Sequence, residues 1–161
     1  MGRSVENEKD MLLSDERYRN VLIVRFNALS DVAMTVPVVY SVCAAHHDKR
    51  FIMLTQPVAS TLFINKPANL EVIAVDVKVK YHGIAGMRRL YRDMMEKYGI
   101  DVVIDLQGTF LTRILGAFFA LRGVPVKRID SGRSGKRALT RRYNKRMFPL
   151  ISFRERYREV F

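Results

Sequence analysis

Short aliphatic runs that alternate with helical patterns dominate this 161-residue sequence. Each run is continuous rather than alternating between polar and apolar residues, which is typical of a strand buried on both faces of a parallel sheet. The chain between successive runs is long enough for a crossover connection. The pattern therefore predicts an α/β fold with a Rossmann-like, doubly wound parallel sheet. Strands are expected at residues 20–26, 50–54, 71–75, 101–106 and 125–129, and helices at 31–45, 57–64, 83–97 and 109–121.

The domain organisation follows from where this alternation begins and ends. Residues 1–19 show no sustained periodicity, so we predict a mobile leader with a helical turn near residues 11–18. Residues 20–161 are then one domain, the organisation that this length favours. The alternation stops after residue 129, and residues 131–161 form a basic segment with a short helix expected at 153–161. No Gly-x-Gly-x-x-Gly fingerprint follows the first strand, and no P-loop occurs, so both nucleotide-cofactor signatures are excluded.

Positive charge is concentrated near the carboxyl terminus. The formal net charge is +12, and residues 122–161 hold thirteen Lys and Arg against three Asp and Glu. Such a surface favours an anionic partner, namely phosphate, nucleic acid or an acidic membrane surface, although a merely solvated face is the alternative. Tyr143 is the only aromatic residue within the densest run, so nucleic acid is the weaker hypothesis. The cations at helical spacing are Lys136, Arg137, Arg141, Arg142, Lys145 and Arg146.

The few cysteine and histidine residues limit the cellular compartment and the metal chemistry. Cys43 is the single cysteine and falls in the apolar pattern of the first long helix, which suits a reducing cytoplasm. Neither a signal peptide nor a membrane span is recognisable. His46 and His47 are adjacent and His82 is remote, so the sequence offers no metal-ligand spacing.

A polar turn follows the first strand and supplies the candidate chemistry. It contains Asn27, Ser30 and Asp31. Ligands of open α/β sheets bind at the carboxyl ends of the strands, where this turn lies. Asp31 has two interpretations: a cap that accepts bonds from the first helical amides, or a general base that accepts a proton from an attacking hydroxyl.

Further polar residues follow other strands and are expected at the same edge of the sheet. Lys78 and Lys80 follow the third strand, Gln107 follows the fourth, and Lys136 and Arg137 follow the fifth. We expect this charge to converge on Asp31 and to bind the anionic groups of a substrate.

Three motifs resemble the amino-terminal half of the glycosyltransferase family 9 enzymes, the ADP-heptose:lipopolysaccharide heptosyltransferases. They are Val-Leu-Ile-Val-Arg-Phe-Asn-Ala-Leu-Ser-Asp-Val-Ala-Met-Thr-Val-Pro at 21–37, Val-Ile-Asp-Leu-Gln-Gly at 103–108 and Lys-Arg-Ala-Leu-Thr-Arg-Arg at 136–142. The resemblance covers residues 20–161 and implies one half of a GT-B fold. In such enzymes two Rossmann-like domains face each other across a cleft, the first holding the acceptor and the second the nucleotide sugar.

The resemblance also implies a reaction and its residues. Asp31 matches the proposed base of the family, which inverts the anomeric centre without a metal or another cofactor. An ADP-sugar would be the donor, and the phosphorylated inner core of lipopolysaccharide would be the acceptor, bound by Asn27, Ser30, Gln107 and the four basic residues named above. Ser30 stands where the family has Gly, which would cause strain if the turn required a positive φ.

The resemblance finally implies what the isolated chain lacks. A donor-binding domain is not recognisable in it, so we expect the 161-residue chain to be inactive alone and to self-associate through the exposed interdomain face. A cytoplasmic protein peripheral to the inner membrane is expected. A non-enzymatic module that docks on phosphorylated lipid or nucleic acid is the alternative function.

Overall fold

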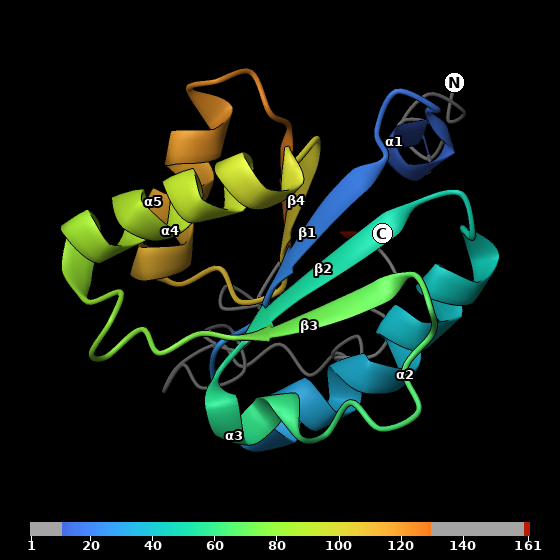
Figure 1. The fold of residues 1–161 in the computed structure, drawn as a ribbon, viewed down its shortest axis with the longest axis horizontal. Helices are drawn as coiled ribbons and strands as arrows, with labels where there is room; N and C mark the ends of the chain where they lie inside the picture. Colours follow the sequence, from blue (N-terminus) through green and yellow to red (C-terminus); the bar gives the residue numbers. More distant parts are fainter. Residues whose placement is uncertain (1–10, 130–159) are drawn as a thin grey trace, which may run out of the picture.

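The computed structural model describes residues 11–129 and 160–161, and this part contains a five-stranded, all-parallel sheet. The strand order is β3-β2-β1-β4-β5, so β1 lies at the centre with β2 and β4 beside it. Figure 1 shows α4 and α5 on one side of the sheet and α2 on the other. The predicted fold class is confirmed. The strands are β1 (Asn20–Val24), β2 (Arg50–Thr55), β3 (Leu70–Ala74), β4 (Val102–Asp105) and β5 (Val126–Arg128), and the helices are α1 (Met11–Ser14), α2 (Leu29–Ala45), α3 (Pro57–Ser60), α4 (Gly83–Tyr98) and α5 (Phe110–Ala120).

Side chains of the central strands pack alternately into two hydrophobic layers. Val21 and Ile23 of β1 belong to the layer beneath α2, whereas Leu22 and Val24 belong to the layer beneath α4 and α5. All four are at most 1% exposed. Burial on both faces explains why the aliphatic run is continuous rather than alternating.

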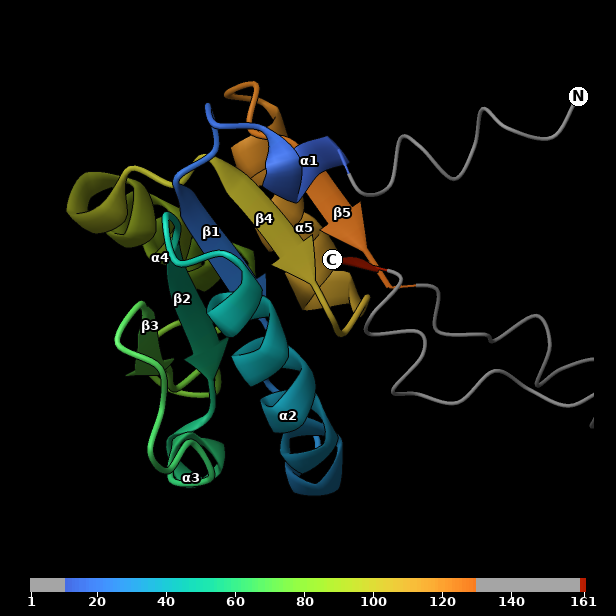
Figure 2. The ribbon, with the colours of Figure 1, turned by 90° about the vertical axis from the view of Figure 1, so that its right-hand side faces the viewer.

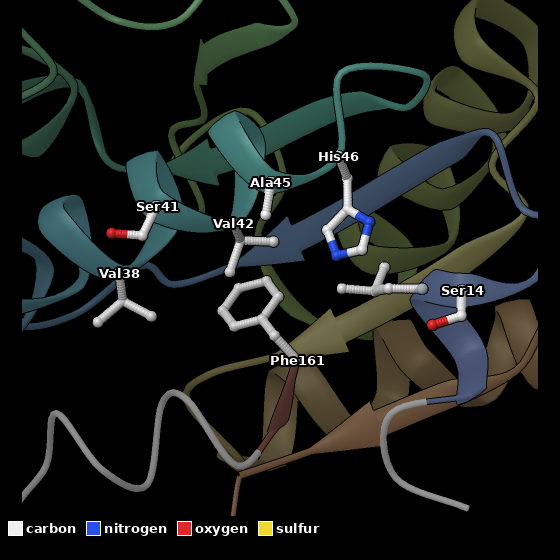
Figure 3. A pocket seen from close by; sticks show the side chains of 8 residues that line it. Ser14, Val38, Ser41, Val42, Ala45, His46 and Phe161 are labelled. Atoms are coloured by element: carbon white, nitrogen blue, oxygen red, sulfur yellow. The ribbon is translucent and has the colours of Figure 1, made fainter.

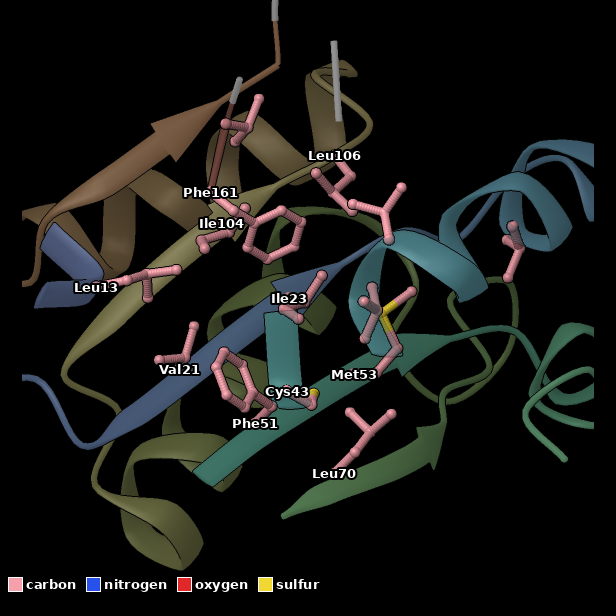
Figure 4. Packing of buried hydrophobic residues seen from close by; sticks show 14 of the residues in the cluster. Leu13, Val21, Ile23, Cys43, Phe51, Met53, Leu70, Ile104, Leu106 and Phe161 are labelled. Atoms are coloured by element: carbon pink, nitrogen blue, oxygen red, sulfur yellow. The ribbon is translucent and has the colours of Figure 1, made fainter. Parts of the chain in front are cut away.

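The layer beneath α2 also includes residues from both ends of the described chain. Leu13 of α1 and Phe161 lie in the same cluster as Cys43 of α2, and Figure 4 shows them around the central strands. Lys49 is 3% exposed, and its Nζ donates to the carbonyls of Asp15 at 3.0 Å and Tyr18 at 2.7 Å. Figure 2 shows α1 beside the sheet. Leu13 is thus buried, and the carbonyls of Asp15 and Tyr18 bind Lys49, so these three residues of the predicted leader contact the domain. Ser14, Glu16, Arg17 and Arg19 are exposed. Residues 1–10 lie outside the described part.

Two boundaries of the predicted helices 31–45, 57–64, 83–97 and 109–121 differ from their predicted positions by two residues or more, and the others agree to within one residue. Helix α2 begins at Leu29 rather than at residue 31, and its N-cap Ala28 offers no side-chain bond. Helix α3 ends at Ser60 rather than at residue 64. Beyond it the amides of Leu62 and Phe63 bond three residues back, at 3.2 and 3.3 Å, which is the tighter pattern of a turn.

The end of α4 agrees with its prediction. Gly99 adopts the left-handed conformation, with φ +57°, and its N–H donates to the Met95 carbonyl at 3.0 Å. Glycine is favoured there because a Cβ would be strained in that conformation.

Candidate functional site

The candidate site lies where the two central parallel strands, β1 and β4, end side by side. Val24 pairs with Asp105 in the register, so the loops that follow both strands leave the same edge. The amide of Leu106 donates to the Val24 carbonyl at 3.0 Å and continues the pairing beyond β4. This edge is where ligands of parallel α/β sheets bind.

An ion pair between Arg25 and Asp31 forms the centre of the site. One guanidinium nitrogen of Arg25 (Nη2) donates to Asp31 Oδ2, and the other (Nη1) donates to the Leu106 carbonyl. The Arg25 side chain is 8% exposed and that of Asp31 is 30% exposed. The buried arginine therefore fixes the carboxylate, which remains accessible to a bound group.

The position of Asp31 in α2 bears on the first of its two interpretations, that of a helix cap. The carboxylate lies in the first turn of α2, but it is not the N-cap of that helix. Ser30 is exposed and helical, and the non-glycine residue with positive φ in the described chain is Asn65. Serine in place of the family's glycine is consequently compatible with this turn without backbone strain.

Gln107 joins the loops after β1 and β4. Its Oε1 accepts bonds from the backbone amides of Phe26 at 2.7 Å and Asn27 at 3.0 Å, and its Nε2 donates to Thr109 Oγ1 at 2.9 Å. The side-chain oxygen therefore holds the backbone that carries the polar turn. The resemblance implies that Gln107 binds substrate, whereas in this structure its polar atoms bind the protein.

Asn27 is a polar side chain of the turn with bonding capacity left. Its Oδ1 accepts a bond from Gln56 Nε2 at 2.8 Å. Asn27 is exposed, and its Nδ2 donates no bond within the described residues. A ligand hydroxyl beside Asp31 can accept a hydrogen bond from Nδ2.

Asp105 is a buried carboxylate beneath the site. It is 1% exposed, and its Oδ1 accepts bonds from the amides of Gln107 and Gly108, each at 2.9 Å. Arg128 Nε lies 3.8 Å from Oδ2. Gly108 has φ +65°, a conformation that favours glycine, so Asp105 and Gly108 together set the turn that presents Gln107.

The lysines expected at the site do not contact Asp31. Both Lys78 and Lys80 are exposed in the loop after β3, and Lys80 Nζ lies 4.9 Å from the centre of the Tyr81 ring. Strand β2 separates β3 from β1, which places this loop roughly 10 Å to one side of the β1 loop. Lys136 and Arg137 lie outside the described residues.

Arg25, Gln56 and Asp105 were not predicted as site residues. Arg25 and Asp105 each stand at the end of an otherwise aliphatic strand run, and a charge in that position was a signal that could have identified them. Gln56 follows β2 and has no comparable signal.

A separate apolar hollow of about 430 Å³ opens between α1, α2 and Phe161. Figure 3 shows Phe161 and His46 among the side chains that line it. Val38 is the lining residue nearest to Asp31 along α2, and it lies seven positions further along the helix, an axial rise of about 10 Å. The hollow is therefore distinct from the candidate site.

The described part of the chain lacks two further features. It contains no group of three or more His, Cys, Asp and Glu residues arranged to bind a metal ion. It also contains no helix whose length and hydropathy would allow it to cross a bilayer.

Comparison with solved structures relates this arrangement to known proteins. A glycosyltransferase family 9 structure from Veillonella parvula matches 89% of this chain with a TM-score of 0.60 and 19% identity. The chain shares the fold of a glycosyltransferase. E. coli heptosyltransferase WaaC with ADP matches 88% of this chain with a TM-score of 0.51 and 22% identity. UDP-GlcNAc 2-epimerase from Neisseria meningitidis matches 70% of it with a TM-score of 0.49 and 18% identity.

The match covers only part of each neighbour. The chain spans 40% of the Veillonella structure, 46% of WaaC and 32% of the epimerase. No family model matches the sequence, and no curated protein matches it either. The fold of a GT-B glycosyltransferase half is therefore common to this chain and its two glycosyltransferase neighbours.

Proposed function

We propose that this chain is the acceptor-binding part of an inverting, heptosyltransferase-like glycosyltransferase. The observation that carries the proposal is the accessible carboxylate of Asp31, which Arg25 fixes at the carboxyl end of the central strand. The same fold occurs in a family 9 glycosyltransferase and in a heptosyltransferase solved with ADP. By analogy, an ADP-sugar is the donor and the phosphorylated inner core of lipopolysaccharide is the acceptor.

In the proposed reaction, Asp31 accepts the proton of the acceptor hydroxyl as that oxygen attacks the anomeric carbon. The bond from the anomeric carbon to the diphosphate breaks, and the nucleotide diphosphate leaves with its electron pair. Proton transfer by a positioned base contributes about a hundred- to ten-thousandfold in rate. Arg25 fixes the direction of the carboxylate, and Asn27 Nδ2 is the proposed donor to a neighbouring acceptor hydroxyl.

Exposed apolar side chains near Asp31 suit the binding of a second domain at this edge of the sheet. Leu29 and Phe110 begin the helices that follow β1 and β4, and they are 51% and 72% exposed. Exposed apolar side chains around a polar centre are common where a partner covers the surface. We propose that a donor-binding domain faces this edge, so that the isolated chain has little affinity for ADP-sugars and can self-associate here.

The substitution Asp31→Asn tests the role of the carboxylate in a chain that also carries a donor-binding domain. Asn is nearly isosteric and keeps an acceptor for Arg25 while losing the basic oxygen. We expect transfer to fall by at least a hundredfold. The matched control is Asp48→Asn, because Asp48 is an exposed carboxylate outside the proposed site, with a side chain that is 67% exposed. Near-normal transfer by a folded Asp31→Asn protein would exclude Asp31 as the base.

The basic residues near the carboxyl terminus are the remaining part of the proposal. Lys136 and Arg137 are proposed to bind the phosphates of the acceptor. Charge-assisted contacts of this kind contribute about 1.5–3 kcal/mol each. Replacing both by Ala should weaken the binding of a phosphorylated acceptor at least tenfold, and an unchanged dissociation constant would assign the contact to other residues.

A further inference from the structure

A second surface, remote from Asp31, concentrates arginine around a hollow. Four arginines line it together with Ala85 and Tyr91, and its volume is about 450 Å³. Three of them belong to α4, and the fourth follows the last turn of α5. All four are exposed, and they are Arg88, Arg89, Arg92 and Arg122.

Carboxylates compensate little of this charge. Arg92 forms a 3.9 Å ion pair with Glu96, both exposed, and such pairs contribute little in water. Arg89 donates to the Lys80 carbonyl at 3.4 Å, which leaves its charge unpaired by an acid. Arg88 and Arg122 make no ion pair within the described residues. The hollow is thus a site of net positive charge.

Exposed aliphatic side chains border the arginines. Ile84 lies one turn before Arg88 on the same face of α4 and is 58% exposed, and Leu121 precedes Arg122 and is 82% exposed. Val79, with 79% exposure, stands between Lys78 and Lys80 in the loop before α4. Exposed large aliphatic residues next to cations are common where a partner covers the surface.

The loop that carries Val79 is fixed against α4. A Cβ at Gly86 would lie 2.1 Å from the Tyr81 carbonyl carbon, so loop and helix approach closely. Asp76 Oδ1 accepts bonds from the amides of Lys78 at 2.9 Å and Val79 at 3.0 Å. The Tyr81 hydroxyl donates to Asp93 Oδ2 at 2.8 Å. The loop and α4 therefore present one preformed surface.

We propose that this surface docks the protein on an anionic phospholipid bilayer, with the arginines on the headgroup phosphates and the aliphatic side chains in the interface. Cations beside exposed aliphatic residues are the combination that such membrane surfaces bind. Proteins that bind single-stranded nucleic acid generally stack its bases on exposed aromatic rings. Tyr91 is partly buried, and its ring packs edge-on against Phe119, with centroids 4.9 Å apart, so it offers no stacking face. The inference does not depend on the proposed sugar transfer.

Fluorescence can locate the contact because the chain contains no tryptophan. We would place single tryptophans by Ile84→Trp or Leu121→Trp, with Ile64→Trp as the control. Ile64 is 70% exposed, and its carbonyl accepts a bond from the Tyr40 hydroxyl of α2 at 2.7 Å, so it lies beside α2 rather than α4. Vesicles of phosphatidylcholine with phosphatidylglycerol should shift the emission of the first two variants to the blue and leave the control unchanged. Binding without a shift at residues 84 and 121, or with a shift confined to residue 64, would overturn the proposal.

Charge neutralisation provides the second readout. Changing Arg88, Arg89, Arg92 and Arg122 together to Gln should lower the partition coefficient on these vesicles at least tenfold. The matched control changes four exposed cations elsewhere to Gln and should lower it less than threefold: Arg17, Arg19, Lys66 and Arg113. The basic segment 131–146 is unchanged in both proteins, so it contributes equally to both measurements. Equal losses of the partition coefficient in the two variants would overturn the proposal. It would also be overturned if single-stranded RNA bound more tightly than the vesicles and shifted the Ile84→Trp emission, while the vesicles left that emission unchanged.

Discussion

Arg25 connects Asp31 to the strand beside it: the guanidinium donates to the Asp31 carboxylate and to the Leu106 carbonyl at the end of β4. The position of the carboxylate is thus determined by two neighbouring strands rather than by the helix in which it lies. This contact makes the site sensitive to changes in a residue that is itself buried.

Replacing Arg25 should destabilise the domain more than replacing its partner. Arg25→Met removes both bonds and leaves the Leu106 carbonyl without this donor, so we expect the free energy of unfolding to fall by about 3–5 kcal/mol. Asp31→Asn keeps an acceptor and should cost less than half as much. Urea denaturation measures both values, and a smaller loss in Arg25→Met than in Asp31→Asn would contradict this account.

Gln107 should stabilise the fold through its side-chain oxygen. Gln107→Met removes the acceptor of the Phe26 and Asn27 amides, which should lower the free energy of unfolding by about 2 kcal/mol. Gln107→Glu retains both acceptor lone pairs and is the matched control, expected to be the milder change. If Met proved no worse than Glu in urea, the oxygen would not be the stabilising group.

The thiol of Cys43 should be unreactive in the folded protein. Burial raises its pKa from 9 to about 12, so the thiolate is scarce and shielded at pH 8. Because the folded pKa exceeds the unfolded one, this stabilisation is complete below pH 9 and is lost as the pH rises toward 12. A disulfide reagent at pH 8 should label the thiol slowly in buffer and rapidly in urea. Equal rates in the two solutions would contradict the burial.

A polar cluster around Glu71 predicts a dependence of stability on acid pH. The hydrogen bond from the Tyr98 hydroxyl, followed by the contacts with Arg50 and Lys97, lowers the pKa of Glu71 below its ordinary value of 4.5. A lowered folded pKa stabilises the protein above pH 4.5, and this contribution disappears as the pH falls through the folded value.

The substitution Tyr98→Phe tests this dependence. It should raise the pKa of Glu71 toward 4.5 and reduce stability at pH 7. The difference in stability between wild type and Tyr98→Phe should decrease as acid protonates the Glu71 carboxylate in both proteins. Urea unfolding midpoints of both proteins between pH 3 and pH 7 measure this difference. A difference in midpoint that stays constant with pH would assign the effect to packing of the Tyr98 ring.

The sequence predicted those features that local residues determine. The strand around Val21–Val24 was predictable because burial on both faces requires a continuous aliphatic run, and the end of α4 was predictable because Gly99 tolerates the left-handed conformation. Features that depend on contacts distant in sequence were missed. Leu13 is buried by residues that include Phe161, and the orientation of Asp31 depends on an arginine fixed by the Leu106 carbonyl.

The placement of the basic residues has the same explanation. Lys78 and Lys80 were correctly predicted in a loop after the third strand. Their distance from Asp31 depends on the strand order, because β2 separates β1 from β3. A single sequence does not specify that order, and the expected convergence on Asp31 therefore placed two lysines too close to it.

The most direct test of the proposed function is a nuclear magnetic resonance titration of the 161-residue chain with a deacylated, phosphorylated inner-core oligosaccharide. Deacylation removes the lipid, so membrane docking does not enter the result. We predict saturable shifts of the backbone amides of Asn27, Ser30 and Asp31, with no shift of these amides when ADP is added instead. Shifts of the three amides by ADP, or saturation by the oligosaccharide that leaves all three unperturbed, would contradict the assignment of this edge as the acceptor site.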